Sequence, residues 1–177
     1  MPCSFKRIAS PVGILTLVAG ADALVAILWE RDPPARVPLD PLVEAPDDAL
    51  LGETARQLDA YFAGRLITFD LPLDFRGTDF QRQVWAALLT IPFGETRSYA
   101  EIARQIGRPD ACRAVGAANG RNPISIVAPC HRVVGSSGAL TGFAGGLAAK
   151  DYLLDLERGG TVGVGSPLGP RQASLAF

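Results

Sequence analysis

The sequence has few of the features that mark membrane, disulfide-rich or metal-binding proteins. No apolar run approaches the roughly 20 residues that span a bilayer, and the first residues lack the basic-then-apolar order of a signal peptide. Among 177 residues there are three cysteines, far apart, and one histidine, which does not suit a disulfide framework or a zinc site. We therefore expect a cytoplasmic protein with reduced thiols and no metal or other cofactor.

A strong charge of either sign is also missing. The formal net charge is -1, which argues against a protein that holds nucleic acid by a large positive field. Residues 1–75 carry six Lys/Arg against eleven Asp/Glu, whereas residues 76–158 carry ten against seven. A polyanionic partner is therefore expected to contact the C-terminal half, with a modest dependence on salt.

The first 75 residues predict a small α/β lobe. Residues 13–19 and 23–29 are apolar, β-branched-rich runs on either side of a short polar break, which favours two strands of an antiparallel sheet. The proline-rich residues 32–48 suit an irregular connection. Residues 48–64 then show apolar positions at the spacing of a helix, namely Leu51, Ala55, Leu58, Tyr61 and Phe62.

Residues 76–158 predict a second, helical lobe. The hydroxyl of Thr78 can cap a helix that follows it, and residues 146–157 form a last amphipathic helix. Residues 159–177, rich in Gly and Pro, are expected to form a flexible tail. The expected fold class is α/β (α+β), with an antiparallel-sheet N-terminal lobe and a helical C-terminal lobe.

Two short helical segments inside the second lobe resemble a helix-turn-helix. The first covers residues 96–106, with either Thr96 or Ser98 as its cap. The second covers residues 109–119, with Pro109 in its first turn.

Cys130 lies between Pro129, whose ring stiffens the backbone, and His131, the single histidine. A free thiol has a pKa of about 8.5, so reactivity near neutral pH requires a group that stabilises the thiolate or removes its proton, and a histidine could do either. Neighbouring side chains diverge by about 100° in a helix and point to opposite faces in a strand. A water bridge between thiol and imidazole is therefore favoured over a direct hydrogen bond.

The imidazole would in turn need an acid to fix its tautomer. The last helix offers three candidates, and the residues alone do not choose among them: Asp151, Asp155 and Glu157. The other thiols have no expected part in this chemistry. Cys112 is expected to pack inside the second short helix, and Cys3 to lie at a frayed terminus.

Residues 77–157 resemble the active domain of the O6-alkylguanine-DNA alkyltransferase family. The motif spacing is intact, and the N-terminal lobe is similar to that of the family as well. The motifs are Gly77-Thr78-Asp79-Phe80-Gln81, Ile91-Pro92-Phe93-Gly94-Glu95-Thr96-Arg97-Ser98-Tyr99, Arg113-Ala114-Val115-Gly116, Asn122-Pro123 and Pro129-Cys130-His131-Arg132-Val133.

The resemblance implies DNA repair by a monomer that acts once on double-stranded DNA containing O6-alkylguanine, and also on O4-alkylthymine. Cys130 would attack the alkyl carbon and keep the alkyl group as a thioether. The implied proton relay runs from Cys130 through water to His131 and Glu157. Of the three acids left open above, the resemblance therefore selects Glu157.

DNA recognition in the family implies a minor-groove helix-turn-helix that rotates the damaged nucleotide out of the stack. Ala114 and Gly116 give the second helix the small surface that this approach needs. Arg113 occupies the position that fills the gap left by the base, and Tyr99 the position that crowds a phosphate. Asn122 is similar to the hinge residue between the recognition helix and the reactive loop.

The resemblance also assigns a substrate pocket. Backbone groups of the reactive cysteine, Val133 and Ala144 would select guanine, and Phe143 would form a wall. Pro129 and Arg132 would support the site. Ala144 stands where many relatives carry Ser, and Phe143 replaces a frequent Tyr, so the preference among alkyl groups stays open. Some members carry a zinc-binding N-terminal extension, and we expect none here, which would exclude a methyl-triggered transcription activator of that kind.

Three other functions compete with alkyl transfer. A lesion-binding protein of the same fold, which flags damage without repair, would lack the cysteine that is present here. A helix-turn-helix regulator would need base-reading Asn, Gln and Arg side chains, which the second helix lacks. A cysteine hydrolase with a Cys130/His131 dyad would turn over an ester or a peptide.

Overall fold

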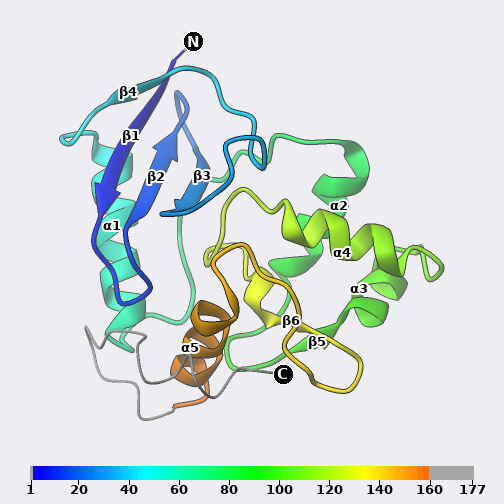
Figure 1. Ribbon diagram of the computed structural model, residues 1–177. Helices are drawn as coiled ribbons and strands as arrows, with labels where there is room; N and C mark the ends of the chain where they lie inside the picture. The colour runs from blue at the N-terminus through cyan, green and yellow to red at the C-terminus, as the bar shows by residue number, and fades with distance from the viewer. Residues whose placement is uncertain (1, 160–177) are drawn as a thin grey trace.

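The N-terminal lobe of the protein is a four-stranded sheet covered by one long helix (Figure 1). The structure is a computed structural model that describes residues 2–159. The strand order is β3-β2-β1-β4, antiparallel except that β4 runs parallel to β1. The elements are β1 (Cys3–Ile8), β2 (Leu15–Ala19), β3 (Leu24–Trp29), β4 (Leu42–Glu44) and α1 (Ala49–Phe62).

The predicted strands at residues 13–19 and 23–29 and the helix at residues 48–64 are confirmed, whereas β1 and β4 were not expected. The expectation for Cys3 was wrong, because its side chain is 2% exposed within β1. Its amide donates to the carbonyl oxygen of Pro41 at 2.9 Å, and the strand is paired on both sides. Pairing of β1 with β2 and β4 therefore orders a terminus that was expected to be frayed.

The C-terminal lobe is mostly helical and carries a two-stranded parallel sheet (Figure 1). The helices of this lobe, together with the sheet of the first lobe, confirm the predicted α/β (α+β) class. The elements are α2 (Asp79–Leu88), β5 (Arg97–Ser98), α3 (Tyr99–Gln105), α4 (Cys112–Gly120), the 3-10 turn η1 (Cys130–Arg132), β6 (Val133–Val134) and α5 (Leu147–Glu157).

Side-chain caps fix the starts of two of these helices. Thr78 and Gln81 form a capping box at the start of α2. At the start of α3, Ser98 accepts a hydrogen bond from the amide of Glu101 at 3.1 Å. Of the two caps left open by the sequence, the structure therefore uses Ser98 rather than Thr96.

The second helix of the pair begins later than predicted. α4 starts at Cys112, because Pro109 lies in a turn closed by a 2.9 Å hydrogen bond from the amide of Ala111 to the carbonyl of Arg108. Proline favours this second position of a turn for the same reason that it favours a first helical turn, namely its fixed φ. Cys112 is exposed, so the expectation that it packs inside the helix was also wrong.

The two lobes share a hydrophobic core. One cluster of buried side chains joins β2, β3 and α1 to the segment before Cys130 and to α5. A second cluster lies between α2, α3 and α4 and includes Cys130 itself. Main-chain pairing adds to the contact, since the amide of Ile27 in β3 donates to the carbonyl of Pro123 at 2.8 Å. The segment that leads to Cys130 is thus built into the junction between the lobes.

Within residues 2–159, no helix combines the length and the hydrophobicity that a membrane crossing requires. The expected tail at residues 159–177 lies, apart from Gly159, outside the described residues.

The cap assignment at α3 can be tested by substitution. Ser98→Ala removes the acceptor for the amide of Glu101, so we expect the free energy of unfolding to fall by about 1 kcal/mol. Thr96→Ala should change it by less than about 0.5 kcal/mol, as an ordinary surface change does. Urea unfolding followed by circular dichroism measures both, and an equal loss in the two variants would contradict the assignment.

Candidate active site around Cys130

Cys130 begins the turn η1 and is 4% exposed, at the junction of the two lobes. Asn122 organises the loop that leads to it: its side-chain NH2 donates to the carbonyl of Ala128 at 2.8 Å, and its side-chain oxygen accepts from the amide of Ile124 at 3.1 Å. The amide of Cys130 donates to the same Ala128 carbonyl at 2.8 Å. A buried asparagine therefore sets the course of the chain into the cysteine.

Arg36, from the irregular connection of the N-terminal lobe, braces the same loop. Its guanidinium donates to the carbonyl of Asn122 at 2.9 Å and to that of Gly120 at 3.2 Å. Asp32 pairs with the other edge of the guanidinium, with Nη2 to Oδ2 at 2.6 Å. Sequence reasoning missed this link, because Arg36 lies more than 80 residues from Gly120 and Asn122 along the chain.

The carboxylate of Glu157, at the end of α5, lies against η1 in a buried ion-pair cluster. Its Oε2 lies 2.7 Å from His131 Nε2, and its Oε1 lies 2.7 Å from Arg132 Nε. A second guanidinium nitrogen of Arg132 donates to Oε2 at 3.0 Å. We refer to Glu157, His131 and Arg132 as the Glu157 cluster.

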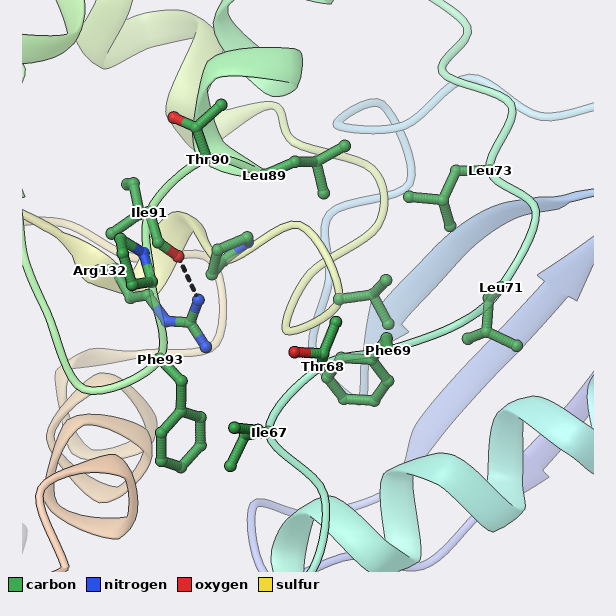
Figure 2. Close-up of a pocket in the computed structure, with 13 residues that line it drawn as sticks. Ile67, Thr68, Phe69, Leu71, Leu73, Leu89, Thr90, Ile91, Phe93 and Arg132 are labelled. Carbon is green, nitrogen blue, oxygen red and sulfur yellow. Dashed lines mark hydrogen bonds between the residues drawn. The ribbon is translucent and has the colours of Figure 1, made fainter.

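Arg132 also ties the cluster to the loop after α2. Its Nη1 donates to the carbonyl oxygen of Ile91 at 2.6 Å, as Figure 2 shows. The two residues line a cavity of about 370 Å³ between that loop and the chain that connects the lobes, and Pro129 lines it too. Cys130 is not among the residues that line this cavity, so its thiol is not reached from there.

Burial sets the protonation states in the site. It raises the pKa of the Cys130 thiol and lowers the pKa of His131, so both groups are neutral near pH 7. Burial alone would raise the pKa of Glu157, but the hydrogen bonds from His131 and Arg132 outweigh it and lower that pKa to about 2. The cluster therefore offers a neutral imidazole beside a fixed carboxylate.

The contact with Glu157 also assigns the imidazole tautomer. Because the carboxylate can only accept, Nε2 of the neutral ring carries the proton, which leaves a lone pair on Nδ1. Within residues 2–159, two buried side-chain atoms have no hydrogen-bond partner, His131 Nδ1 and Asn119 Oδ1. The imidazole thus has an unused proton acceptor in a site that holds a protonated thiol.

Lys150 in α5 holds the loop that follows β6. Its buried ammonium donates to the carbonyls of Val133 at 2.6 Å and Thr141 at 3.3 Å, and burial lowers its pKa to about 8. Tyr99 contacts the same loop, since its hydroxyl lies 2.7 Å from the hydroxyl of Thr141. Gly116 of α4 lies beside the Tyr99 ring, where an added Cβ would be 3.8 Å away.

The aromatic residue of that loop packs on the N-terminal lobe. The rings of Phe143 and Trp29 meet edge to face with centroids 5.3 Å apart. Gly145 lies so close to the indole that an added Cβ would come within 2.7 Å of it. Ala144 and Gly145 line a separate cavity of about 190 Å³ together with residues of the N-terminal lobe. Trp29 therefore supports the loop, a role that sequence reasoning missed.

The structure brings some of the predicted residues together and leaves others apart. Cys130 and Asn122 lie in the buried loop beside the Glu157 cluster, whereas Arg113 and Ala114 are exposed on α4. In the part of the chain that the structure describes, no group of three or more His, Cys, Asp or Glu side chains could hold a metal ion.

Both halves of the chain match models of one protein family. Residues 5–75 match the model described as 6-O-methylguanine DNA methyltransferase, ribonuclease-like domain, and residues 79–159 match 6-O-methylguanine DNA methyltransferase, DNA binding domain.

Similar proteins and structures agree with these matches. The methylated-DNA--protein-cysteine methyltransferase of Mycobacterium tuberculosis is 53% identical over 156 residues, which cover 87% of this chain and 92% of the relative. The protein of the same name from Methanosarcina acetivorans is 49% identical over 148 residues, 84% of this chain and 94% of the relative. A crystal structure of Mycobacterium tuberculosis OGT in complex with DNA superposes with a TM-score of 0.80, at 49% identity, over 93% of this chain and 95% of that one.

Two buried asparagines allow a matched test of the loop. Asn122→Ala leaves the Ala128 carbonyl short of a donor and the Ile124 amide unpaired, so we expect the free energy of unfolding to fall by about 3 kcal/mol. Asn119 makes one long bond, 3.5 Å from its side-chain nitrogen to the carbonyl of Cys130. Asn119→Ala should therefore cost about 1 kcal/mol. Equal losses in urea unfolding would contradict the role of Asn122 in organising the loop.

Proposed function

Since the chain belongs to the 6-O-methylguanine DNA methyltransferase family, we propose that it repairs DNA by moving the methyl group of O6-methylguanine onto its own Cys130. The resemblance expected from the motifs is thereby confirmed. The observation that carries the assignment to Cys130 is its burial in η1 directly before His131, the one imidazole of the chain, which Glu157 holds at 2.7 Å.

In the proposed step, the thiol proton passes through a water molecule to His131 Nδ1. The sulfur then attacks the methyl carbon in line, an S–C bond forms, and the C–O6 bond breaks. Its electron pair stays with guanine, which takes up one proton. Glu157 supports the proposal, because a carboxylate at 2.7 Å stabilises the imidazolium that the transfer creates.

The product is a thioether. Removal of its alkyl group would require the cysteine thiolate to leave, and the Glu157 cluster has no means to activate this poor leaving group. One protein molecule therefore accepts one alkyl group, and the reaction is stoichiometric. We propose that it takes place in the cytoplasm, where thiols stay reduced, and that O4-alkylthymine is a second substrate.

Binding of duplex DNA is proposed for the face of α3 and α4. Ala114 and Gly116 give α4 a small surface, which would let its backbone approach the floor of the minor groove. The exposed Arg113 would fill the gap left by the rotated nucleotide. Tyr99, tied to Thr141, would press on a phosphate of the same strand.

The pocket for the rotated base is proposed between Tyr99 and the loop held by Lys150. Backbone groups of Cys130, Val133 and Ala144 would select guanine, and Phe143 would form one wall. The edge-to-face contact of Phe143 with Trp29 supports this, because it fixes the ring from behind. Pro129, Arg132 and Asn122 would hold the surrounding backbone.

The transfer itself can be tested on duplex DNA that contains one O6-methylguanine. We expect one methyl group per protein molecule, located by mass spectrometry of the peptide that contains Cys130, and no further turnover. Cys130→Ser should bind the duplex and accept no methyl group. Methyl on another residue, or continued turnover, would overturn the proposal.

The role of Arg113 can be separated from the chemistry. Arg113→Ala should slow methyl transfer from duplex DNA by about tenfold or more, because the gap in the stack is left unfilled, and should leave the reaction with free O6-methylguanine base within about twofold. Arg104→Ala, which changes an exposed arginine at the end of α3, serves as the control for loss of charge. Equal losses on both substrates would contradict the role of Arg113.

A further inference from the structure

The carboxylate of Glu157 receives a hydrogen bond from the N-terminal lobe that the proposed relay does not use. The hydroxyl of Tyr61 donates to Glu157 Oε2 at 2.5 Å. Tyr61 lies in α1, so this donor comes from the N-terminal lobe and reaches across the junction to the end of α5. Its side chain is 1% exposed, so the hydrogen bond is shielded from bulk solvent.

Donors from three parts of the chain surround this carboxylate. Oε2 accepts from Tyr61, from His131 at 2.7 Å and from Arg132 at 3.0 Å, and Oε1 accepts from Arg132 at 2.7 Å and from the amide of Gly94 at 3.5 Å. The titratable and charged groups around it are Tyr61 on α1, His131 and Arg132 on η1, and Lys150 and Tyr152 on α5.

Packing fixes the direction of the Tyr61 hydroxyl. The ring meets Phe62 at 5.4 Å and Phe93 at 6.3 Å, both edge to face, and meets Phe69 in a tilted arrangement at 5.3 Å between centroids. A ring enclosed on these sides has little freedom to turn its hydroxyl away from Glu157. Burial, together with the nearby carboxylate, raises the pKa of Tyr61, so the hydroxyl remains a donor throughout the physiological range.

We propose that Tyr61 is a positioning residue for alkyl transfer, which keeps the Glu157 carboxylate anionic and aimed at His131 Nε2. The inference rests on the proposed function. His131 can accept the thiol proton at Nδ1 only while Nε2 keeps its own proton, and Nε2 keeps it only while Glu157 stays an acceptor. Tyr61 therefore acts through Glu157 and touches neither the substrate nor Cys130.

The proposal fixes the sign of a pH effect. A carboxylate that loses a donor becomes more basic, so removal of the Tyr61 hydroxyl should raise the pKa of Glu157 and, through the stronger remaining bond, that of His131. Protonation of either group blocks the relay. The acid limb of the pH profile should therefore move to higher pH, and the rate at alkaline pH should change little.

The test is the single-turnover rate of methyl transfer from duplex DNA, measured across pH in Tyr61→Phe. We expect the acid limb to move up by about one pH unit, with a loss of about tenfold at low pH and of less than about threefold at high pH. The affinity for unmodified duplex DNA should not change, because α1 does not contribute to the proposed DNA-binding face.

Gln57→Leu is the matched control. Gln57 is buried on the same helix, and its side chain exchanges two hydrogen bonds of 2.9 Å with the backbone of Asp70. This variant should lose stability and keep the wild-type pH profile. A profile of Tyr61→Phe that coincides with those of the wild type and Gln57→Leu would overturn the positioning role.

A second variant covers the case in which Tyr61→Phe does not fold. Replacement of Tyr61 by 3-fluorotyrosine keeps the ring and strengthens the donor, so the acid limb should move to lower pH; an unchanged limb would also overturn the proposal. Failure of the wild type to carry methyl on Cys130 would reject the proposed function instead, so the two failures are distinguishable.

Discussion

A buried carboxylate is the constraint on which the structure depends. Glu157 stays charged only because donors from separate parts of the chain compensate for its lost hydration, among them Arg132 beside the cysteine and Tyr61 in the opposite lobe. Each donor must be held in place by its own packing. Hydrogen bonds to this one carboxylate therefore link the end of α5, the turn η1 and α1. Cys130 is the first residue of η1 and is held in the same arrangement.

The N-terminal lobe contributes to the site although Cys130 itself belongs to the other lobe. It aims Tyr61 at Glu157, braces the loop before the cysteine through Arg36, and supports Phe143 through Trp29. Trp29 lies in the sheet, whereas Arg36 and Tyr61 follow it in the chain. Three of the four strands, β1 to β3, pair in the ordinary antiparallel way. The N-terminal lobe therefore positions the segment around Cys130 through three separate contacts.

Local patterns in the sequence predicted what local forces determine. The capping of α2 by Thr78 and the two strands of residues 13–19 and 23–29 follow from neighbours in the chain, whereas Thr96 and Ser98 stayed open as caps of α3 until the structure selected Ser98. The order of Cys3 could not be predicted, because its strand depends on pairing with segments that come later. Among the acids of α5, only the family resemblance selected Glu157, since helical spacing does not say which side chain meets η1. Tyr61 was expected only as an apolar position of its helix, because the residues near it do not indicate a hydrogen bond to Glu157, 96 residues later in the chain.

The hydrophobic core that runs through both lobes has a consequence for how a damaged base and the thiol come together. Buried side chains from β3, α1, α5 and the segment before Cys130 belong to one cluster, so the two lobes are packed around one continuous core. A scaffold of this kind deforms little when it meets its partner. In the proposed function, the distortion that exposes the lesion would then fall mainly on the double helix, whose resistance to bending would contribute to the barrier.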